Sequence, residues 1–244
     1  MSYQIIKLES VDSTNIYLSE LARMNKFPAK TVVWALSQTQ GRGQYQRSWF
    51  SEPGKNITIS ILIKPLRFKV ENSFYISATA AIALSDAVRS LLKAEVKIKW
   101  PNDVLVNGIK VGGILIENAI QGEELIHAVL GFGLNVNQEK FDKHIRATSL
   151  KLETGKTFEL EQVLHRLLDY LEMRLVQLEN RQYKAIIDEY NKNLYKLNTV
   201  QPFSRGDEQF DAIIEGVTND GRLTLNHKSK IEKYRHGSIR FADF

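Results

Sequence analysis

"KWPNDVLVNGIKVGGILIE", residues 99–117, is the stretch that decides the fold class of this chain. Pro101 stops the short strand "VKIKW", because proline lacks the amide hydrogen that a strand ladder needs. Asn107-Gly108, between two apolar runs, predicts a tight type I′ hairpin. A further strand, "ELIHAVLGFGLNVN", pairs back across the turn "QGEE". The middle of the chain therefore predicts neighbouring antiparallel strands.

Helices and more strands are predicted on both sides of this stretch. "YQIIKLE", "TVVWALS" and "NITISILIK" have the alternation or the β-branched apolar content of strands. A helix follows "DSTN", with Asp12, Ser13 or Thr14 as its cap. Amphipathic or alanine-rich patterns predict a long helix over 71–93 and one or two helices over 159–195. The expected class is α+β, with a mixed or antiparallel sheet backed by helices.

The sequence changes character after residue 196. Short strands alternate there with the turn segments "SRGDE", "TNDGR" and "NHKSK", which predicts a small all-β domain. We therefore expect a main domain over residues 1–196 and a C-terminal β domain over 197–244.

Composition excludes several classes of function. The chain has 244 residues and no cysteine, which rules out disulfides and thiolate nucleophiles and suits a reducing cytoplasm. Its five histidines lack ligand spacing, so we expect no zinc site. No apolar run is long enough for a membrane span, and no signal peptide is apparent. A net charge of +5 without a basic run favours anionic small molecules or acidic partners over nucleic acid.

"GRGQYQRSW", residues 41–49, combines flexible backbone with cations and has no acidic residue. Gly41 and Gly43 permit positive φ and a close approach of backbone N–H groups to a ligand. Arg42 and Arg47 offer guanidinium groups that suit phosphate or carboxylate. The loop is therefore a candidate anion cradle, although a simple flexible turn explains these residues equally well.

Three polar residues of the 99–117 stretch are candidates for ligand contact. Asn102 and Asp103 follow Pro101, where an amide and a carboxylate can orient a magnesium–phosphate group or simply form an Asx turn. Lys110 follows the hairpin turn and either points its charge into a pocket or extends to solvent. Two strand glycines after it, Gly112 and Gly113, indicate close approach of a ligand or of backbone.

Two further motifs carry polar groups of the same kind. "DSTN", residues 12–15, is a helix cap whose hydroxyls can also bind a small polar ligand. "GFGLNVN", residues 131–137, has strand glycines that indicate close approach, or a core strand with bulges. Asn135 within it can bond an amide-like edge.

The order of these motifs, followed by a short β tail, resembles the biotin protein ligase family over essentially the whole chain. The resemblance implies a catalytic domain like that of class II aminoacyl-tRNA synthetases, with an SH3-like C-terminal β-barrel. It implies that biotin and ATP form biotinyl-5′-AMP. The biotinyl group then passes to one lysine of a biotin carboxyl carrier protein, or of the carrier domain of a carboxylase. Magnesium would accompany ATP, and a homodimer through an exposed sheet edge is compatible with the family.

The resemblance also implies roles for individual residues. Arg42, Asp103 and Lys110 would be catalytic, and Asp103 would also accept the proton of the incoming amine. The residues expected to bind biotin are Ser13, Thr14, Asn15, Gln38, Gly41, Arg42, Gly43, Gln44, Lys110, Gly112 and Gly113. Those expected to bind ATP are Arg42, Arg47, Trp49, Lys99, Asn102, Asp103, Lys110 and Asn135. Magnesium would be held by the ATP phosphates and Asp103.

One position departs from the family. Its loop commonly continues Gly-Arg-Gly-Arg, whereas this chain has Gln44 in the fourth place. A charge-assisted contact becomes a neutral one, so we expect a weaker hold on the intermediate unless Arg47 compensates. The loop itself is expected to be mobile when empty and to close over the adenylate.

Three alternatives compete with this assignment. A biotin-sensing DNA-binding repressor needs an N-terminal helix-turn-helix domain, and "DSTN" at residues 12–15 leaves no room for one. A lipoate or octanoyl transferase shares the fold, but "KWPND" and the β tail favour biotin. A non-catalytic anion-binding module is disfavoured because the loop arginines and the Lys110 strand are both present.

Overall fold

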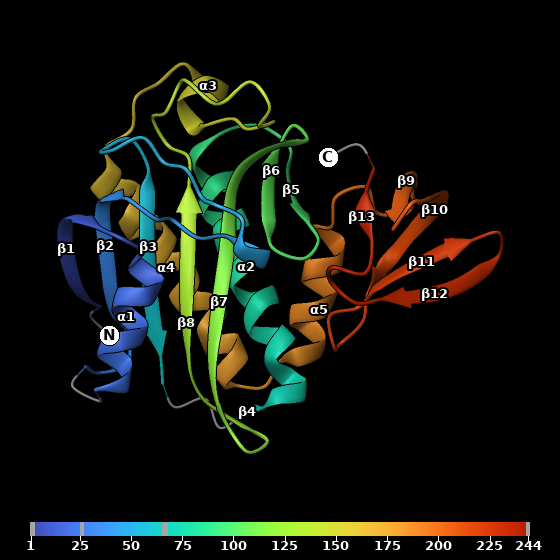
Figure 1. Ribbon diagram of the computed structural model, residues 1–244, viewed down its shortest axis with the longest axis horizontal. Coiled ribbons are helices and arrows are strands. Elements are labelled where there is room, and N and C mark those ends of the chain that lie inside the picture. The colour runs from blue at the N-terminus through green and yellow to red at the C-terminus, as the bar shows by residue number, and fades with distance from the viewer. Residues whose placement is uncertain (1–2, 25–26, 65–67, 243–244) are drawn as a thin grey trace.

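A mixed sheet of eight strands forms the centre of the molecule in the computed structural model, which describes residues 3–24, 27–64 and 68–242 (Figure 1). The strands are β1 (Gln4–Val11), β2 (Thr31–Gln38), β3 (Ile57–Ile63), β4 (Phe68–Lys69), β5 (Val96–Lys99), β6 (Asp103–Val106), β7 (Ile109–Gln121) and β8 (Glu124–Leu134). Their order is β1-β2-β3-β8-β7-β6-β5, with β4 beside β8. Only β1 and β2 run parallel among these described pairs. The α+β class predicted from the sequence is confirmed.

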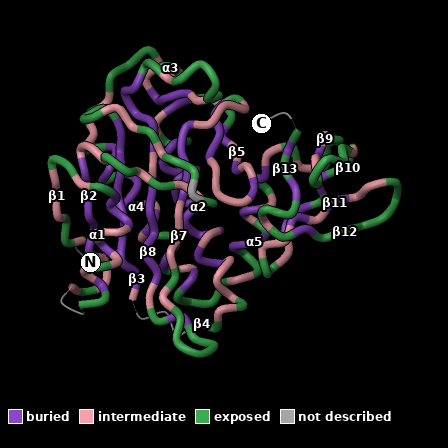
Figure 2. The backbone as a smooth tube through the Cα atoms, viewed as in Figure 1, coloured by how far each residue is buried: buried purple, intermediate pink, exposed green. Residues whose placement is uncertain are grey.

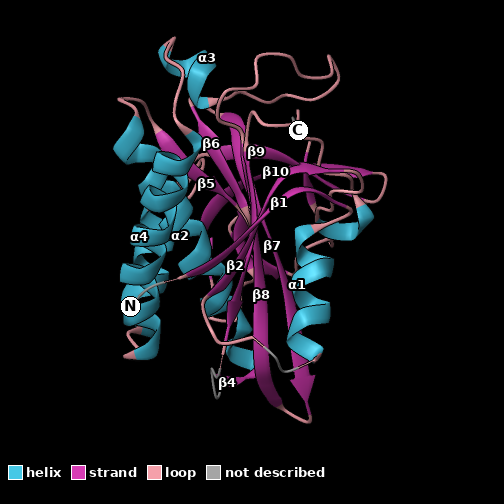
Figure 3. Ribbon diagram, turned by 90° about the vertical axis from the view of Figure 1, so that its left-hand side faces the viewer, coloured by secondary structure: helices cyan, strands magenta, loops and turns pink. Residues whose placement is uncertain are grey.

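Helices cover both faces of this sheet (Figure 3). The helices are α1 (Thr14–Arg23), α2 (Ser73–Leu91), α3 (Leu150–Thr154), α4 (Leu160–Glu179) and α5 (Tyr183–Lys192), with single 3-10 turns at Gln44–Gln46 and Val70–Asn72. In Figure 3, α1 lies on one side of the sheet and α2 and α4 lie on the other.

Alternation along the central strands explains this layering. Ile57, Ile59 and Ile61 of β3 point into the large core under α2 and α4, whereas Leu62 joins a smaller core under α1. The α2 helix is rich in buried alanines, whose small side chains let it pack closely against α4. Figure 2 shows that burial is concentrated in the central strands and in the inner surface of these helices.

The hairpin after β6 has the predicted turn. Asn107 and Gly108 both have positive φ, 49° and 77°, as a type I′ turn requires. Because the turn sets the register, Val106 pairs with Ile109, and a register shift next to Leu105 brings Asp103 opposite Gly113. The tight turn thus brings the start of β6 and the middle of β7 together at one place.

A second, antiparallel sheet forms the C-terminal part. Its strands are β9 (Val200–Arg205), β10 (Glu208–Val217), β11 (Leu223–His227), β12 (Lys230–Tyr234) and β13 (Arg240–Phe241), in the order β12-β11-β10-β9-β13. Phe203 and Ile214 of this sheet belong to the same core cluster as α2. Asn191 of α5 bonds both the N–H and the C=O of Val217, and Trp100 Nε1 donates to Gly221 O at 2.9 Å. The C-terminal sheet is therefore packed against the main body, and the boundary at 196/197 stays a prediction.

No helix among the described residues is both long enough and apolar enough to cross a membrane.

An ion-pair network joins α2 to α4. Asp86 is buried and accepts bonds from Arg89 Nη1 at 2.8 Å and from Arg174 Nη2 at 2.5 Å. Arg89 also reaches Asn193 Oδ1 at 2.8 Å, beyond the end of α5. The Asp86 carboxylate thus links α2 to α4, and Arg89 extends the network to the end of α5.

Replacing Asp86 with alanine should lower the free energy of unfolding by about 3 kcal/mol, because two guanidinium groups lose their buried partner. Urea denaturation measures the effect. Asp188→Ala, which breaks the exposed Lys184–Asp188 pair, is the control and should cost about 0.5 kcal/mol or less. Equal losses in the two variants would contradict the role assigned to Asp86.

Candidate active site

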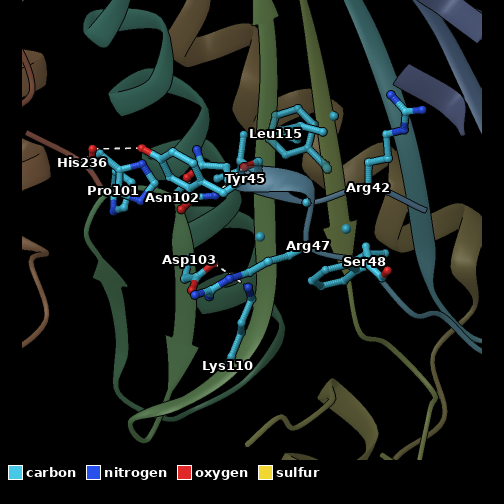
Figure 4. A pocket seen from close by; sticks show the side chains of 18 of the residues that line it. Arg42, Tyr45, Arg47, Ser48, Pro101, Asn102, Asp103, Lys110, Leu115 and His236 are labelled. Carbon is cyan, nitrogen blue, oxygen red and sulfur yellow. Dashed lines mark hydrogen bonds and ion pairs between the residues drawn. The ribbon is translucent and has the colours of Figure 1, made fainter. Parts of the chain in front are cut away.

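A cavity of about 420 Å³ lies on the α1 face of the sheet (Figure 4). Residues from distant parts of the chain line it, among them the start of α1, the end of β2, the 41–49 segment, the end of β5 with the turn after it, β7, β8 and the C-terminal part. The lining includes Ser13, Thr14, Asn15, Gln38, Arg42, Gly43, Gln44, Tyr45, Arg47, Trp49, Lys99, Asn102, Asp103, Lys110, Gly113, Leu115, Gly131, Gly133, His236, Arg240 and Phe241. Most of the residues that the sequence singled out are therefore gathered at one place.

The N-terminus of α1 forms one end of the cavity. Ser13 occupies the N-cap position but its side chain makes no capping bond. The first-turn N–H of Thr14 instead donates to Gln38 Oε1 at 2.8 Å, and the Thr14 hydroxyl donates to the same oxygen at 3.1 Å. The cap is therefore supplied by Gln38 at the end of β2. The helix begins within "DSTN" as predicted, but the capping side chain does not come from "DSTN" itself.

A chain of buried polar groups continues from there. Ser60 donates to Asn15 Oδ1 at 2.5 Å, and Asn15 Nδ2 donates to Glu117 Oε2 at 2.9 Å. A Cβ on Gly131 would lie 2.2 Å from Asn15 Oδ1, so only glycine fits beneath this side chain. The close approach predicted for "GFGLNVN" is confirmed, with a side chain of the protein itself as the partner. The ends of this chain offer both donors and acceptors to a small polar ligand.

The glycine loop, residues 41–49, folds as a tight hairpin. Trp49 N donates to Gly41 O at 2.9 Å, and Gly43 N donates to Arg47 O at 2.7 Å. A Cβ on Gly41 would lie 2.3 Å from Trp49 O, so this glycine serves the approach of the two arms. Neither Gly41 nor Gly43 has positive φ; the left-handed residue is Tyr45, at φ 54°. The positive φ that the glycines permit is therefore not used by them, because the hairpin turns through Tyr45.

Trp49 rests on the sheet through another glycine. A Cβ on Gly133 would lie 2.4 Å from the indole, which therefore packs directly on the β8 backbone. Lys110 Nζ lies 5.4 Å from the centre of the same indole ring, within cation–π range. Trp49 Nε1 and Gln44 Oε1 are buried and have no hydrogen-bond partner among the described residues. One donor and one acceptor at the cavity are thus left for a ligand.

Lys110 and Asp103 form an ion pair in the cavity wall, with Nζ and Oδ1 2.6 Å apart (Figure 4). Gly113 leaves space for this pair, since a Cβ there would lie 3.4 Å from both charged atoms. Asn102 Nδ2 donates to Ile114 O at 2.6 Å, which fixes the turn before β6. The carboxylate and the ammonium are therefore held by rigid strands rather than by a loop.

Positive charge dominates the cavity. Its described lining has five cations, Arg42, Arg47, Lys99, Lys110 and Arg240, and one carboxyl, Asp103. Burial lowers the pKa of Lys99 to about 8; Asp103 opposes the shift, and Lys110 and Arg47 add to it. Burial also lowers the pKa of His236 to about 4. An anionic ligand would relieve the repulsion among these cations.

Some predicted site residues lie elsewhere. Asn135 is buried behind the cavity, where its Nδ2 donates to Thr148 O at 3.0 Å. Gly112 packs against Gly133 O and Leu84, and Gly41 lies outside the lining. Arg42 borders the cavity, but in Figure 4 its guanidinium points away from Lys110, toward a second cavity that it also lines.

Comparison with known proteins identifies the family. The model of the biotin/lipoate A/B protein ligase family matches residues 8–135. The chain belongs to this family. As a family member it is 33% identical to the bifunctional ligase/repressor BirA of Bacillus spizizenii, over 99% of this chain and 75% of that protein. It is 31% identical to the biotin–[acetyl-CoA-carboxylase] ligase of Mycobacterium tuberculosis, over 91% and 83%.

A solved structure of a biotin ligase has the same fold. The biotin protein ligase of Aquifex aeolicus, in complex with biotin and ATP, superposes with a TM-score of 0.83 at 26% identity. The match covers 98% of this family member and 99% of that chain. The two sheets therefore occur together in a ligase of this family.

Several lining residues of this ligase-family chain escaped the sequence analysis. Tyr45, His236, Arg240 and Phe241 meet the cavity through contacts between distant segments. The last three follow β12, in a region whose alternating pattern indicates strands and turns but no partner surface. Ser60, which bonds the lining residue Asn15, lies in an apolar strand. A single serine among the apolar residues of "NITISILIK" is the only sequence signal for it.

Gly133→Ala should displace Trp49 and loosen the glycine loop, because the new methyl group would overlap the indole. Trypsin cleavage after Arg47 measures the change, and we expect it to accelerate about tenfold by loss of local protection. Gly155→Ala, at φ 70° with open space around it, is the matched control for backbone strain alone. Equal cleavage rates in both variants would show that the indole contact does not hold the loop.

Proposed function

We propose that this chain activates biotin with ATP and transfers the biotinyl group to a lysine of a biotin carboxyl carrier protein or carrier domain. The observation that supports this best is the cavity itself, whose described lining has five cations and one carboxyl. The first step joins two anions, so fixed positive charge is the chief requirement. The named relatives and the biotin- and ATP-bound neighbour favour the same chemistry.

In the first step, a carboxylate oxygen of biotin attacks the α-phosphorus of ATP, and the bond to the pyrophosphate leaving group breaks. Lys110 and Arg47 would offset the repulsion between these groups, and Lys99 would face the phosphates. The head group of biotin would bond to the polar chain at the start of α1, where Thr14 and Asn15 are already held by neighbours. Preorganised donors of this kind need not reorient as charge develops.

In the second step, the lysine amine of the carrier attacks the acyl carbon, and AMP leaves with the electron pair of the broken C–O bond. The amine must lose a proton, and Asp103 has the only carboxyl in the described lining. Asp103 is paired with Lys110 before substrates bind. Binding of the anionic substrates would draw Lys110 toward them and leave the Asp103 carboxylate to accept that proton.

The protein side chains of this site would supply only some of the ligands of a magnesium ion. The described residues contain no group of three or more acidic or histidine side chains that could hold a metal. Oxygens of the triphosphate, together with Asp103, would supply the hard ligands that Mg²⁺ prefers. When bound, the ion would neutralise charge on the leaving pyrophosphate.

The family includes lipoate ligases, so the acid must be established by experiment. Biotin is favoured because the chain of hydrogen-bonding groups from Gln38 to Glu117 suits a polar head group with donors and acceptors. The dithiolane of lipoate offers neither. Competition between labelled biotin and labelled lipoate, each with ATP and the purified chain, distinguishes the two.

Lys110→Ala should reduce biotin-dependent ATP–pyrophosphate exchange by about a hundredfold, since it removes one fixed charge from the reacting groups. Arg42→Ala should reduce exchange less if the orientation of Arg42 in Figure 4 persists in the complex. Lys151→Ala, which removes a half-buried lysine outside the cavity that is paired with Glu139, is the control and should leave exchange unchanged. Exchange that is absent in the wild type, or equal in Lys110→Ala, would contradict the proposal.

Lys99 should give the reaction a pH limit. Its ammonium is charged below pH about 8 and neutral above it, so nucleotide capture weakens as pH rises through this value. We expect kcat/KM for ATP to fall about tenfold per pH unit on the alkaline side, because this ratio reports groups of the free enzyme. Lys99→Arg, whose guanidinium stays charged, should extend the plateau beyond pH 9. A limb that does not move in Lys99→Arg would assign the titration to another group.

A further inference from the structure

The glycine loop contacts the segment between β12 and β13 of the C-terminal sheet through an aromatic cluster formed by Tyr45, His236 and Trp100. The Tyr45 hydroxyl donates to the backbone oxygen of His236 at 2.9 Å, and the two rings lie 4.8 Å apart. The His236 ring meets Trp100 edge-on at 5.4 Å. Three segments that are far apart in the sequence thus meet at the rim of the cavity.

Tyr45 itself has an unusual conformation. Its φ and ψ are 54° and 43°, a left-handed conformation that is rare for a bulky residue. Its side chain is 65% exposed, so burial in a core does not explain the conformation. Strained residues of this kind persist where surrounding contacts fix them, and here those contacts come from His236.

The cluster is also compatible with its charged surroundings. His236 lies near Asp103, Arg47 and Lys99. Burial is the main cause of the low pKa of His236, about 4, so the ring is neutral at physiological pH. A neutral ring can pack against Tyr45 and Trp100 without adding a sixth cation to the cavity.

We propose that Tyr45 and His236 form a latch that holds the glycine loop on the C-terminal sheet and retains the acyl-nucleotide after it forms. The identity of the retained acyl-nucleotide rests on the proposed function. The contact that holds the glycine loop on the C-terminal part does not, because it is made by the protein's own residues. Tyr45 and His236 act as positioning residues, because they hold Arg47 and Trp49 over the cavity. The latch consists of aromatic contacts and one hydrogen bond. It therefore does not need a charged side chain at position 44, where this chain has the neutral Gln44.

Two substitutions separate the two contacts of the latch. Tyr45→Phe keeps the ring and loses the hydrogen bond, whereas His236→Ala loses the neighbouring imidazole ring and keeps the backbone acceptor. Tyr45→Ala loses both. Phe50→Ala is the control, since it removes a 70% exposed aromatic residue next to the loop but outside the latch.

Dissociation of preformed biotinyl-5′-AMP, chased with excess biotin, measures retention. We expect Tyr45→Ala to raise the dissociation rate about tenfold and each partial variant to raise it about threefold. The rate of acyl-nucleotide formation, from pyrophosphate exchange, should fall by a smaller factor than retention, because Lys99 and Lys110 stay in place on β5 and β7 when the loop opens. Unchanged dissociation in Tyr45→Ala would overturn the latch. A Tyr45→Ala variant that forms the acyl-nucleotide as poorly as it retains it, and that also melts at a lower temperature, would overturn the latch as well. That result would mean that Tyr45 only supports the fold.

Trypsin cleavage after Arg47 in the substrate-free protein tests separately whether the contact of Tyr45 with His236 holds the glycine loop. Tyr45→Ala should be cleaved about tenfold faster than wild type, and Phe50→Ala at the wild-type rate. A wild-type chain that forms no acyl-nucleotide would defeat the proposed function but leave this comparison intact. Equal cleavage of Tyr45→Ala and wild type would overturn the latch whatever the activity of the chain.

Discussion

Repulsion between like charges is the constraint on which the site depends. Arg47, Lys99, Lys110 and Arg240 come from four separate segments and meet at one cavity, where their positive charges oppose one another. The Lys110–Asp103 pair, with 2.6 Å between its charged atoms, supplies the one compensating negative charge in the described lining. The antiparallel pairing of β6 with β7 keeps that pair in place. Such an arrangement is unfavourable when empty and becomes favourable when anions bind, which suits capture of a carboxylate and a triphosphate.

Mobile and rigid parts of the site have different physical supports. The polar groups at the start of α1 and the charges on β6 and β7 are fixed by hydrogen bonds and by strand pairing. The glycine loop is held by its own short backbone bonds, by Trp49 on Gly133 and by Tyr45 on His236. Its contacts with the rest of the protein are aromatic surfaces rather than strand pairing. The loop can therefore open at modest cost, as a reaction that admits biotin and ATP and releases pyrophosphate and AMP requires.

The features that the sequence predicted are those with local signals. Asn107-Gly108 predicted its own turn, and the glycines of "GFGLNVN" predicted close approach, because such geometry depends on the residue itself. The cations Arg47 and Lys110 were found because charge beside glycine on an apolar background is unusual.

The features that the sequence missed depend on contacts between distant segments. His236 and Arg240 reach the cavity only because the C-terminal sheet packs on the main body. Asn135 resembled a ligand residue but is buried just after β8, where its side chain bonds the backbone at Thr148. The positive φ in the glycine loop lies at Tyr45 rather than at a glycine, because a distant contact fixes the tyrosine.

The most direct test of the electrostatic account is a calorimetric cycle with two ligands and two proteins. Biotin carries a carboxylate, and biotinamide has the same shape without the charge. The wild type should bind biotin about thirtyfold more tightly than biotinamide, since a charge-assisted contact contributes about 2 kcal/mol. In Lys110→Met this preference should almost disappear. A preference of the same size in both proteins would show that Lys110 does not meet the carboxylate, and the account of how the two anions come together would fail.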